Sequence, residues 1–193
     1  MTDEATPEVV TASAPIGATV VYTTPDMIAE REAVAGLFNL ARHLADTEWG
    51  KPFNNDAAKM LASIMQGREL GVGPMTSLRE IGVIHGRPFL SAELRLGLVR
   101  SAGHSVTGEA TAEKAWATGK RHDTGEEITI TYTLAEAVSE GVVTLTAEGK
   151  PRARSEGGKP LPWERYTPQM LWAGAIRRLC DRLFSECLIG RAL

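Results

Sequence analysis

The chain has few cysteines and no long apolar run. Its 193 residues contain only Cys180 and Cys187, and no stretch approaches the roughly eighteen apolar residues that a membrane span needs. The acidic residues 1–4 lack the apolar region of a secretory signal. The cysteines are seven apart in a stretch that we expect to be one helix, which is too far for a disulfide. We therefore predict buried thiols in a reducing, cytoplasmic location.

Motifs that would mark an enzyme are missing as well. A phosphate-binding Walker loop has Ser or Thr after its Gly-Lys pair, whereas proline follows both Lys150 and Lys159, so ATP-driven action is not expected. The Gly-x-Ser-x-Gly motif does not occur, and the histidines are scattered singly. Asp26 and Glu148 faintly resemble a nuclease pattern, but an acid at a helix start such as Asp26 is favourable anyway. We predict no enzyme, and neither metal nor cofactor.

The composition is that of an ordinary globular protein, with 43% hydrophobic and 23% charged residues. Residues 1–24 have no periodicity and are predicted to form a flexible N-terminal tail, followed by one core domain over residues 25–193. The pattern predicts helices at 26–45, 56–70, 75–80 and 92–102, strands near 82–85, 87–90, 105–119 and 126–133, and a short helix opened by a capping box of Thr133 and Glu136. Asn55 should cap the second helix. The fold class is therefore α+β, with helices packed around a small antiparallel sheet.

The last predicted helix begins at Thr167, whose hydroxyl would cap it, with Pro168 at its first position. Its apolar residues repeat at helical spacing and should face a core; they are Trp172, Ile176, Leu179, Leu183 and Cys187. Off this stripe, Arg178 and Arg182 are four residues apart and should be displayed side by side. Arg177 points elsewhere and could form a surface ion pair with Asp181.

A basic loop precedes this helix. Between Ala147 and Trp163 the chain has four cations among three glycines and three prolines, and apart from Leu161 little of it could pack. The cations are Lys150, Arg152, Arg154 and Lys159. Residues 150–193 hold nine Lys/Arg against four Asp/Glu, although the whole chain has a net charge of -3. The interpretations are a mobile loop, residues 148–162, that engages an anionic partner, or a plain solvated surface loop.

Four stretches together resemble a known family. The run Trp163-Glu164-Arg165-Tyr166-Thr167-Pro168-Gln169-Met170-Leu171, followed by Arg177-Arg178 and Phe184, resembles the C-terminal core signature of phage single-strand annealing proteins, the RecT/Red-beta superfamily. Residues 66–74, 81–88 and 133–141 resemble further family motifs in the same order, so that the resemblance covers roughly residues 55–190. The chain departs from the pattern in two places. It ends at Leu193, where longer relatives continue into a partner-binding domain, and residues 72–90 match loosely.

This resemblance implies a RecT/Red-beta-like annealing core and an ATP-independent protein for phage homologous recombination. Such a protein binds single-stranded DNA and the annealed duplex intermediate in a positively charged groove, inside the cytoplasm of an infected bacterium. It also implies a homo-oligomer, a ring or helical filament, for which helix 26–45 is our candidate contact, and possible partners in a phage exonuclease or a host single-strand-binding protein. The alternative is a passive single-strand-binding or scaffold protein without annealing activity.

The candidate DNA contacts combine cations with aromatic side chains, as single-strand binders do. Guanidinium groups suit phosphate oxygens, while Trp163 and Tyr166 would either stack on bases or pack in the core. Lys120 and Arg121 are weaker candidates on another element. The full set is Lys150, Arg152, Arg154, Lys159, Trp163, Arg165, Tyr166, Arg177, Arg178, Arg182, Lys120 and Arg121.

Overall fold

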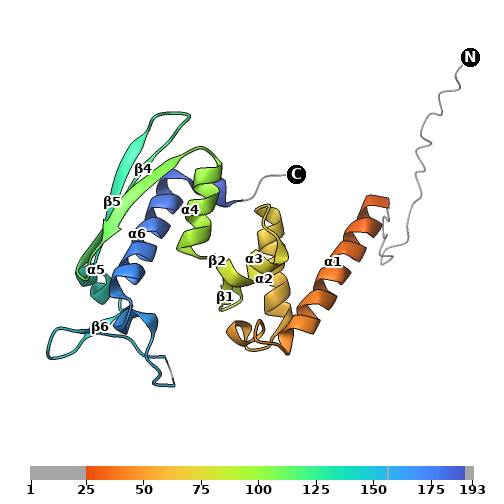
Figure 1. Ribbon diagram of the computed structural model, residues 1–193, viewed down its shortest axis with the longest axis horizontal. Helices are drawn as coiled ribbons and strands as arrows, with labels where there is room; N and C mark the ends of the chain where they lie inside the picture. Colours follow the sequence, from red (N-terminus) through yellow and green to blue (C-terminus); the bar gives the residue numbers. More distant parts are fainter. Residues whose placement is uncertain (1–24, 156, 190–193) are drawn as a thin grey trace, which may run out of the picture.

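The computed structural model describes residues 25–155 and 157–189, which form two lobes with separate apolar cores (Figure 1). The predicted tail, residues 1–24, lies outside the described residues. The N-terminal lobe consists of α1 (Pro25–Ala45), a 3-10 turn (Lys51–Phe53), α2 (Ala57–Glu69), α3 (Pro74–Glu80) and the hairpin of β1 (Ile81–Ile84) and β2 (Arg87–Leu90). These elements match the predicted ones within a residue or two.

The core of this lobe is small and comes from α1, α2, α3 and the turn between the first two helices. Its buried side chains are Ala41, Ala45, Phe53, Met60, Ile64 and Leu78. The start of α2 corrects one prediction. Asp56, not Asn55, caps the helix, because its Oδ1 accepts hydrogen bonds from the N–H groups of Ala58 at 2.9 Å and Lys59 at 3.2 Å. Asn55 instead takes a left-handed conformation, with φ at 57°.

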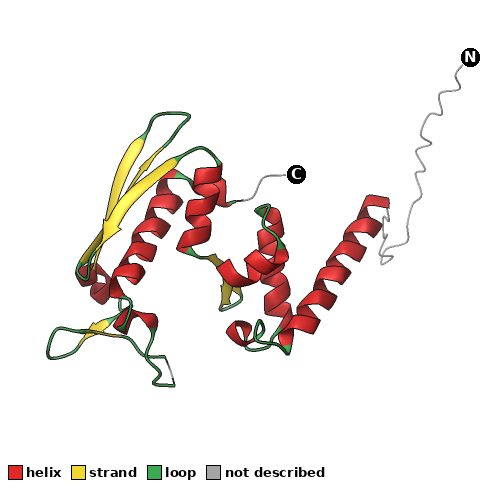
Figure 2. Cartoon of the chain, viewed as in Figure 1, coloured by secondary structure: helices red, strands yellow, loops and turns green. Residues whose placement is uncertain are grey.

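The C-terminal lobe is a three-stranded antiparallel sheet covered on one face by a long helix (Figure 2). It contains α4 (Ala92–Ser101), β3 (Ser105–Ala110), β4 (Lys114–Lys120), β5 (Glu127–Thr133), α5 (Leu134–Ser139), β6 (Thr144–Leu145), β7 (Pro151–Arg152) and α6 (Thr167–Leu183), with 3-10 turns at Pro162–Glu164 and Ser185–Leu188. The Thr133–Glu136 capping box at α5 is confirmed. The coarse α+β class is confirmed too.

The strand predicted over residues 105–119 is wrong, because the chain turns within it. Thr111 Oγ1 accepts hydrogen bonds from the N–H groups of Glu113 and Lys114 at 3.3 and 3.2 Å, which reverses the chain between β3 and β4. β4 is therefore the central strand, paired with β3 on one side and with β5 on the other. The β5 alternation does place Tyr132 in the core.

Helix α6 lies close against the sheet because small residues face it. A Cβ on Gly174 would lie 2.2 Å from the Tyr132 ring, so that only glycine fits there. Leu171, Ala175, Ile176 and Leu179 are fully buried along the same helix. The predicted core face of the helix is thus confirmed for Ile176, Leu179 and Leu183, whereas Trp172 is only half-buried.

Helix α6 begins at Thr167 with Pro168 in its first turn, as predicted, but its cap and its end differ from the prediction. The Thr167 hydroxyl does not cap the helix; it donates a hydrogen bond to the Trp163 carbonyl at 2.7 Å. The helix ends at Leu183, so that Cys180 is buried in α6 while Cys187 lies in the following 3-10 turn and is half-buried. Burial raises the pKa of the Cys180 thiol to about 11. Among the described helices, none is long and apolar enough to cross a membrane.

Candidate nucleic-acid interface

The basic loop of the sequence is a double hairpin, which we call the hairpin segment (residues 144–155 and 157–166). Its first arm pairs β6 with β7, and its second arm is closed by a bridge between Arg154 and Pro160. Gly149 and Gly158 occupy the two turns with φ at 74°, a conformation that favours glycine. The loop therefore has a defined hydrogen-bonded shape, contrary to the expectation that its composition prevents one. Its mobility stays a prediction.

Ala153 anchors the hairpin segment to the core, and Glu164 ties the parts of the segment together. Ala153 is buried, and its N–H donates to Glu164 Oε1 at 3.2 Å. The same oxygen accepts from Arg154 Nε at 2.9 Å. Arg154 thus stabilises the segment through an internal ion pair, although 42% of its side chain is exposed. Leu161, the residue expected to pack, is 37% exposed.

The other cations of this segment are exposed. Lys150, Arg152, Lys159 and Arg165 lie on the hairpin arms and just before α6. None of them forms an ion pair with a described carboxylate, whereas nine other described arginines and lysines do. Their positive charge therefore remains open to an outside partner.

The two aromatic candidates have opposite environments. Trp163 is only 6% exposed and belongs to the core of the C-terminal lobe, so the packing alternative holds for it. Tyr166 is 55% exposed beside Arg165. The structure thus leaves Tyr166 as the aromatic side chain that a nucleotide base could reach on this segment.

Arg178 is not displayed as expected. Its Nη1 lies 3.1 Å from Glu136 Oε1, its Nη2 bonds Glu140, and its guanidinium group sits 4.0 Å from the centre of the Tyr132 ring. Tyr132 completes the cluster by donating to Glu140 Oε2 at 3.0 Å. Burial and the Glu140 charge raise the pKa of Tyr132 to about 12. Arg178 therefore joins α6 to α5 and β5.

The other two arginines of α6, Arg177 and Arg182, are exposed and pair with no carboxylate in the described parts of the chain. The predicted Arg177–Asp181 pair is wrong. Asp181 Oδ1 instead accepts from Arg95 Nη1 of α4 at 2.6 Å, which ties the two helices together. Arg177 and Arg182 thus remain candidates for phosphate contact in the half of α6 farther from the hairpin segment.

Lys120 and Arg121 are the weakest of the predicted contacts. Lys120 lies 3.5 Å from Glu127 across the strand pair. Arg121 bonds Asp123 through Nε at 2.9 Å and Nη2 at 2.6 Å, and also bonds the Leu183 carbonyl and Glu186. The hydrogen bonds from Arg121, helped by one from the Thr124 N–H, hold the pKa of Asp123 well below its usual range. Arg121 therefore fixes the β4–β5 turn to the end of α6.

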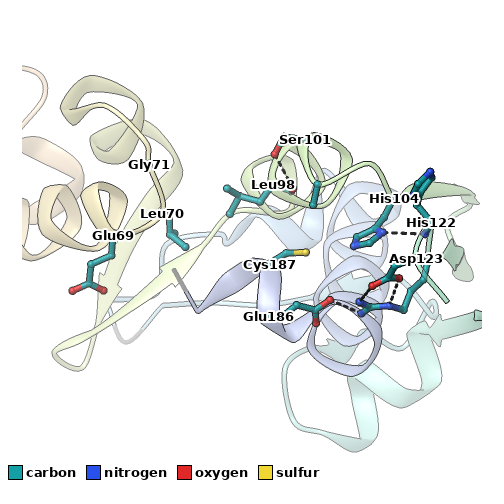
Figure 3. Close-up of a pocket in the computed structure, with 12 residues that line it drawn as sticks. Glu69, Leu70, Gly71, Leu98, Ser101, His104, His122, Asp123, Glu186 and Cys187 are labelled. Carbon is teal, nitrogen blue, oxygen red and sulfur yellow. Dashed lines mark hydrogen bonds and ion pairs between the residues drawn. The ribbon is translucent and has the colours of Figure 1, made fainter. Parts of the chain in front are cut away.

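A cleft of about 590 Å³ lies between the end of α2 and the C-terminal lobe (Figure 3). Its ionic lining contains one arginine, Arg121, against the carboxylates of Glu69, Asp123 and Glu186. An excess of negative charge makes it unsuitable for a phosphate backbone. His104, Glu186 and Cys187 also meet here, a juxtaposition that the sequence does not signal because His104 lies far from the other two along the chain.

The candidate interface is therefore the exposed basic surface of the hairpin segment, with Arg177 and Arg182 farther along α6. Its exposed positive charge is of the kind that suits an extended polyanion, and it includes the exposed aromatic ring of Tyr166. No family model matches the chain, and no curated protein matches its sequence. The RecT/Red-beta resemblance thus rests on the quoted motifs.

Proposed function

We propose that the chain binds single-stranded DNA along the hairpin segment and anneals complementary strands without ATP. The observation that supports this most is the set of exposed cations free of described carboxylates, namely Lys150, Arg152, Lys159 and Arg165. Cations that neutralise phosphates release condensed counterions, and this release drives binding that is largely independent of sequence.

The surface beyond these cations suits a single strand. Tyr166 is exposed next to Arg165 and can stack on a base, which every base permits because each has a π face. Arg177 and Arg182 add two further exposed cations on α6, whose 17 residues span roughly 26 Å at 1.5 Å per residue. An extended strand of several nucleotides covers this length.

The annealing part of the proposal rests on the family resemblance. Pairing of complementary strands is downhill, with stacking worth about 1.4 kcal/mol per base-pair step, so a protein has only to hold the strands extended and aligned. Such a task needs no nucleotide hydrolysis. A protein with this task needs a binding surface rather than a catalytic pocket. Phage homologous recombination is the setting that the resemblance indicates.

Assembly into a homo-oligomer is part of the same proposal. Residues 29–33 of α1 are exposed and Phe38 is 38% exposed, so a large part of this helix is open to a neighbouring copy. Repeating head-to-tail contacts would give a ring or a helical filament along the DNA. Light scattering that finds a monomer both alone and on annealed DNA would contradict this part.

The test replaces Lys150, Arg152, Lys159 and Arg165 with serine. Four lost phosphate contacts should lower the salt slope of single-strand binding by about 2.8, since each contributes about 0.7 on single strands. Annealing, followed by fluorescence without ATP, should slow accordingly at near-physiological salt. The matched control replaces four exposed cations outside α1 and outside the candidate DNA contacts, Lys51, Arg79, Arg87 and Lys114, and removes the same charge.

The outcomes separate the candidate functions. Equal losses in the hairpin and control variants would reduce the effect to net charge and overturn the site. Binding without faster annealing in the parent protein would favour the passive binder or scaffold. Shortened DNA after magnesium is added would indicate a nuclease instead.

A further inference from the structure

His104, Glu186 and Cys187 bring three metal-ligand types together at the cleft. Their ligand atoms all lie within 4.8 Å of one another. His104 directly precedes β3, while Glu186 and Cys187 lie in the 3-10 turn after α6. In Figure 3 the Cys187 sulfur points toward the His104 ring, and the Glu186 side chain lies below Cys187. A metal ion here would fasten the end of the described chain to the start of the sheet.

The charge around these residues favours a cation. Arg121 already donates two hydrogen bonds to Asp123, at 2.9 and 2.6 Å, so that the Asp123 charge balances it. Glu186, which Arg121 also contacts, is then surplus negative charge, and Glu69 adds another carboxylate to the cleft lining. The cleft is thus the opposite of the basic hairpin segment.

The His104 ring is held in place before any ion arrives. It stacks on the buried Phe184 ring with centroids 5.0 Å apart, and its Nδ1 accepts a hydrogen bond from the His122 N–H at 3.1 Å. A neutral ring in this arrangement carries its proton on Nε2. A metal at Nδ1 replaces the His122 N–H, and a metal at Nε2 moves the proton to Nδ1 and breaks the same bond. Binding through either nitrogen therefore perturbs the His122 amide.

We propose that His104, Glu186 and Cys187 bind a zinc ion. Thiolate and imidazole ligands select zinc over calcium or magnesium, which prefer oxygen ligands alone. Three protein ligands leave the fourth tetrahedral position to water, so this site is open, unlike the closed four-ligand sites of zinc fingers. Ion binding to the folded chain stabilises it by mass action.

The test titrates the metal-free full-length protein with Co²⁺, whose charge-transfer absorption reports a bound thiolate, and then measures Zn²⁺ affinity by competition. The parent protein should show the band and a saturable site with one ion per chain, and Zn²⁺ should raise Tm and shift the His122 amide signal. Cys187→Ser should abolish the band. His104→Asn should weaken Zn²⁺ binding at least tenfold, as losing even an outer partner of a ligand does.

Matched controls are Cys180→Ala, which removes the buried thiol, and His43→Asn, which removes an exposed histidine on α1. Both should keep the parental affinity and the band. If Cys187→Ser fails to fold, Glu186→Gln serves in its place and should weaken Zn²⁺ binding. Absence of a thiolate band in the parent, or equal affinity in the site and control variants, overturns the proposal without touching the DNA-binding surface.

Discussion

The hairpin segment and the sheet-facing helix α6 use the same residue types in different ways. On the hairpin segment, Lys150 and Arg152 stand exposed, without a carboxylate among the described residues. On α6, Arg178 lies between two carboxylates and over an aromatic ring, and it is only 27% exposed. A count of charges along the chain treats both alike. The fold, rather than the number of charges, therefore decides which cations are left unpartnered.

Trp163 and Tyr166, at the junction of these two regions, should differ most in what their loss does to the protein. Trp163→Ala should lower the free energy of unfolding by about 3–5 kcal/mol, because it empties a buried tryptophan site. Tyr166→Ala should leave stability nearly unchanged but weaken single-strand binding by about 1–3 kcal/mol, the usual value of one base–aromatic stack. Chemical denaturation and fluorescence anisotropy with an oligonucleotide measure the two effects.

Tyr166→Phe is the control for the ring itself, since it keeps the stacking surface and should bind like the parent. If Tyr166→Ala binds DNA as tightly as the parent while Trp163→Ala remains folded and binds weakly, the roles of the two rings are reversed. The strand would then have to reach the site that Trp163 occupies.

The arginines of α6 give the second comparison. Arg178→Ala should cost about 1–2 kcal/mol of stability, because it leaves Glu136 and Glu140 without their shared partner, and it should not change the salt slope of DNA binding. Arg182→Ala should change stability by less than about 0.5 kcal/mol and lower the slope by about 0.7. Thermal unfolding and salt titrations of the two single variants separate structure from binding. A smaller slope in a folded Arg178→Ala protein would show that the Glu136–Glu140 clamp opens for DNA.

Features set by neighbouring residues could be predicted from the sequence. The Thr133–Glu136 capping box, the β1–β2 hairpin and the buried side of α6 all follow from spacing over a few residues. The choice between two neighbouring cap residues could not be made from the sequence alone. Asn55 and Asp56 are both good caps, and only the left-handed turn that Asn55 occupies decides between them.

The candidate site was less predictable, because it depends on contacts between distant segments. Arg178 meets Glu136 and Glu140 only once α5 packs beside α6. Asp181 takes Arg95 rather than Arg177 for the same reason. Composition suggested that the hairpin segment has no fixed shape, but the burial of Ala153 and its bond to Glu164 could not be seen without the fold.

Acid should weaken the cluster in which Arg178 pairs with Glu136 and Glu140, and this effect is the smallest that we predict. Hydrogen bonds hold the pKa of Glu136 below its ordinary value of 4.5. The largest effect comes from the Thr133 hydroxyl, followed by the Thr133 N–H and then Arg178. A carboxyl group whose pKa is lower in the folded state stabilises the fold above its unfolded pKa, and this contribution disappears as the pH falls through the folded pKa. Glu136→Gln should therefore lose less Tm than the parent between about pH 5 and pH 3.

Glu126→Gln is the matched control, since that side chain is exposed and accepts no hydrogen bond from a described residue. It should follow the parental curve. If Glu136→Gln instead parallels the parent throughout this range, the Arg178 cluster contributes nothing to the acid sensitivity of the fold.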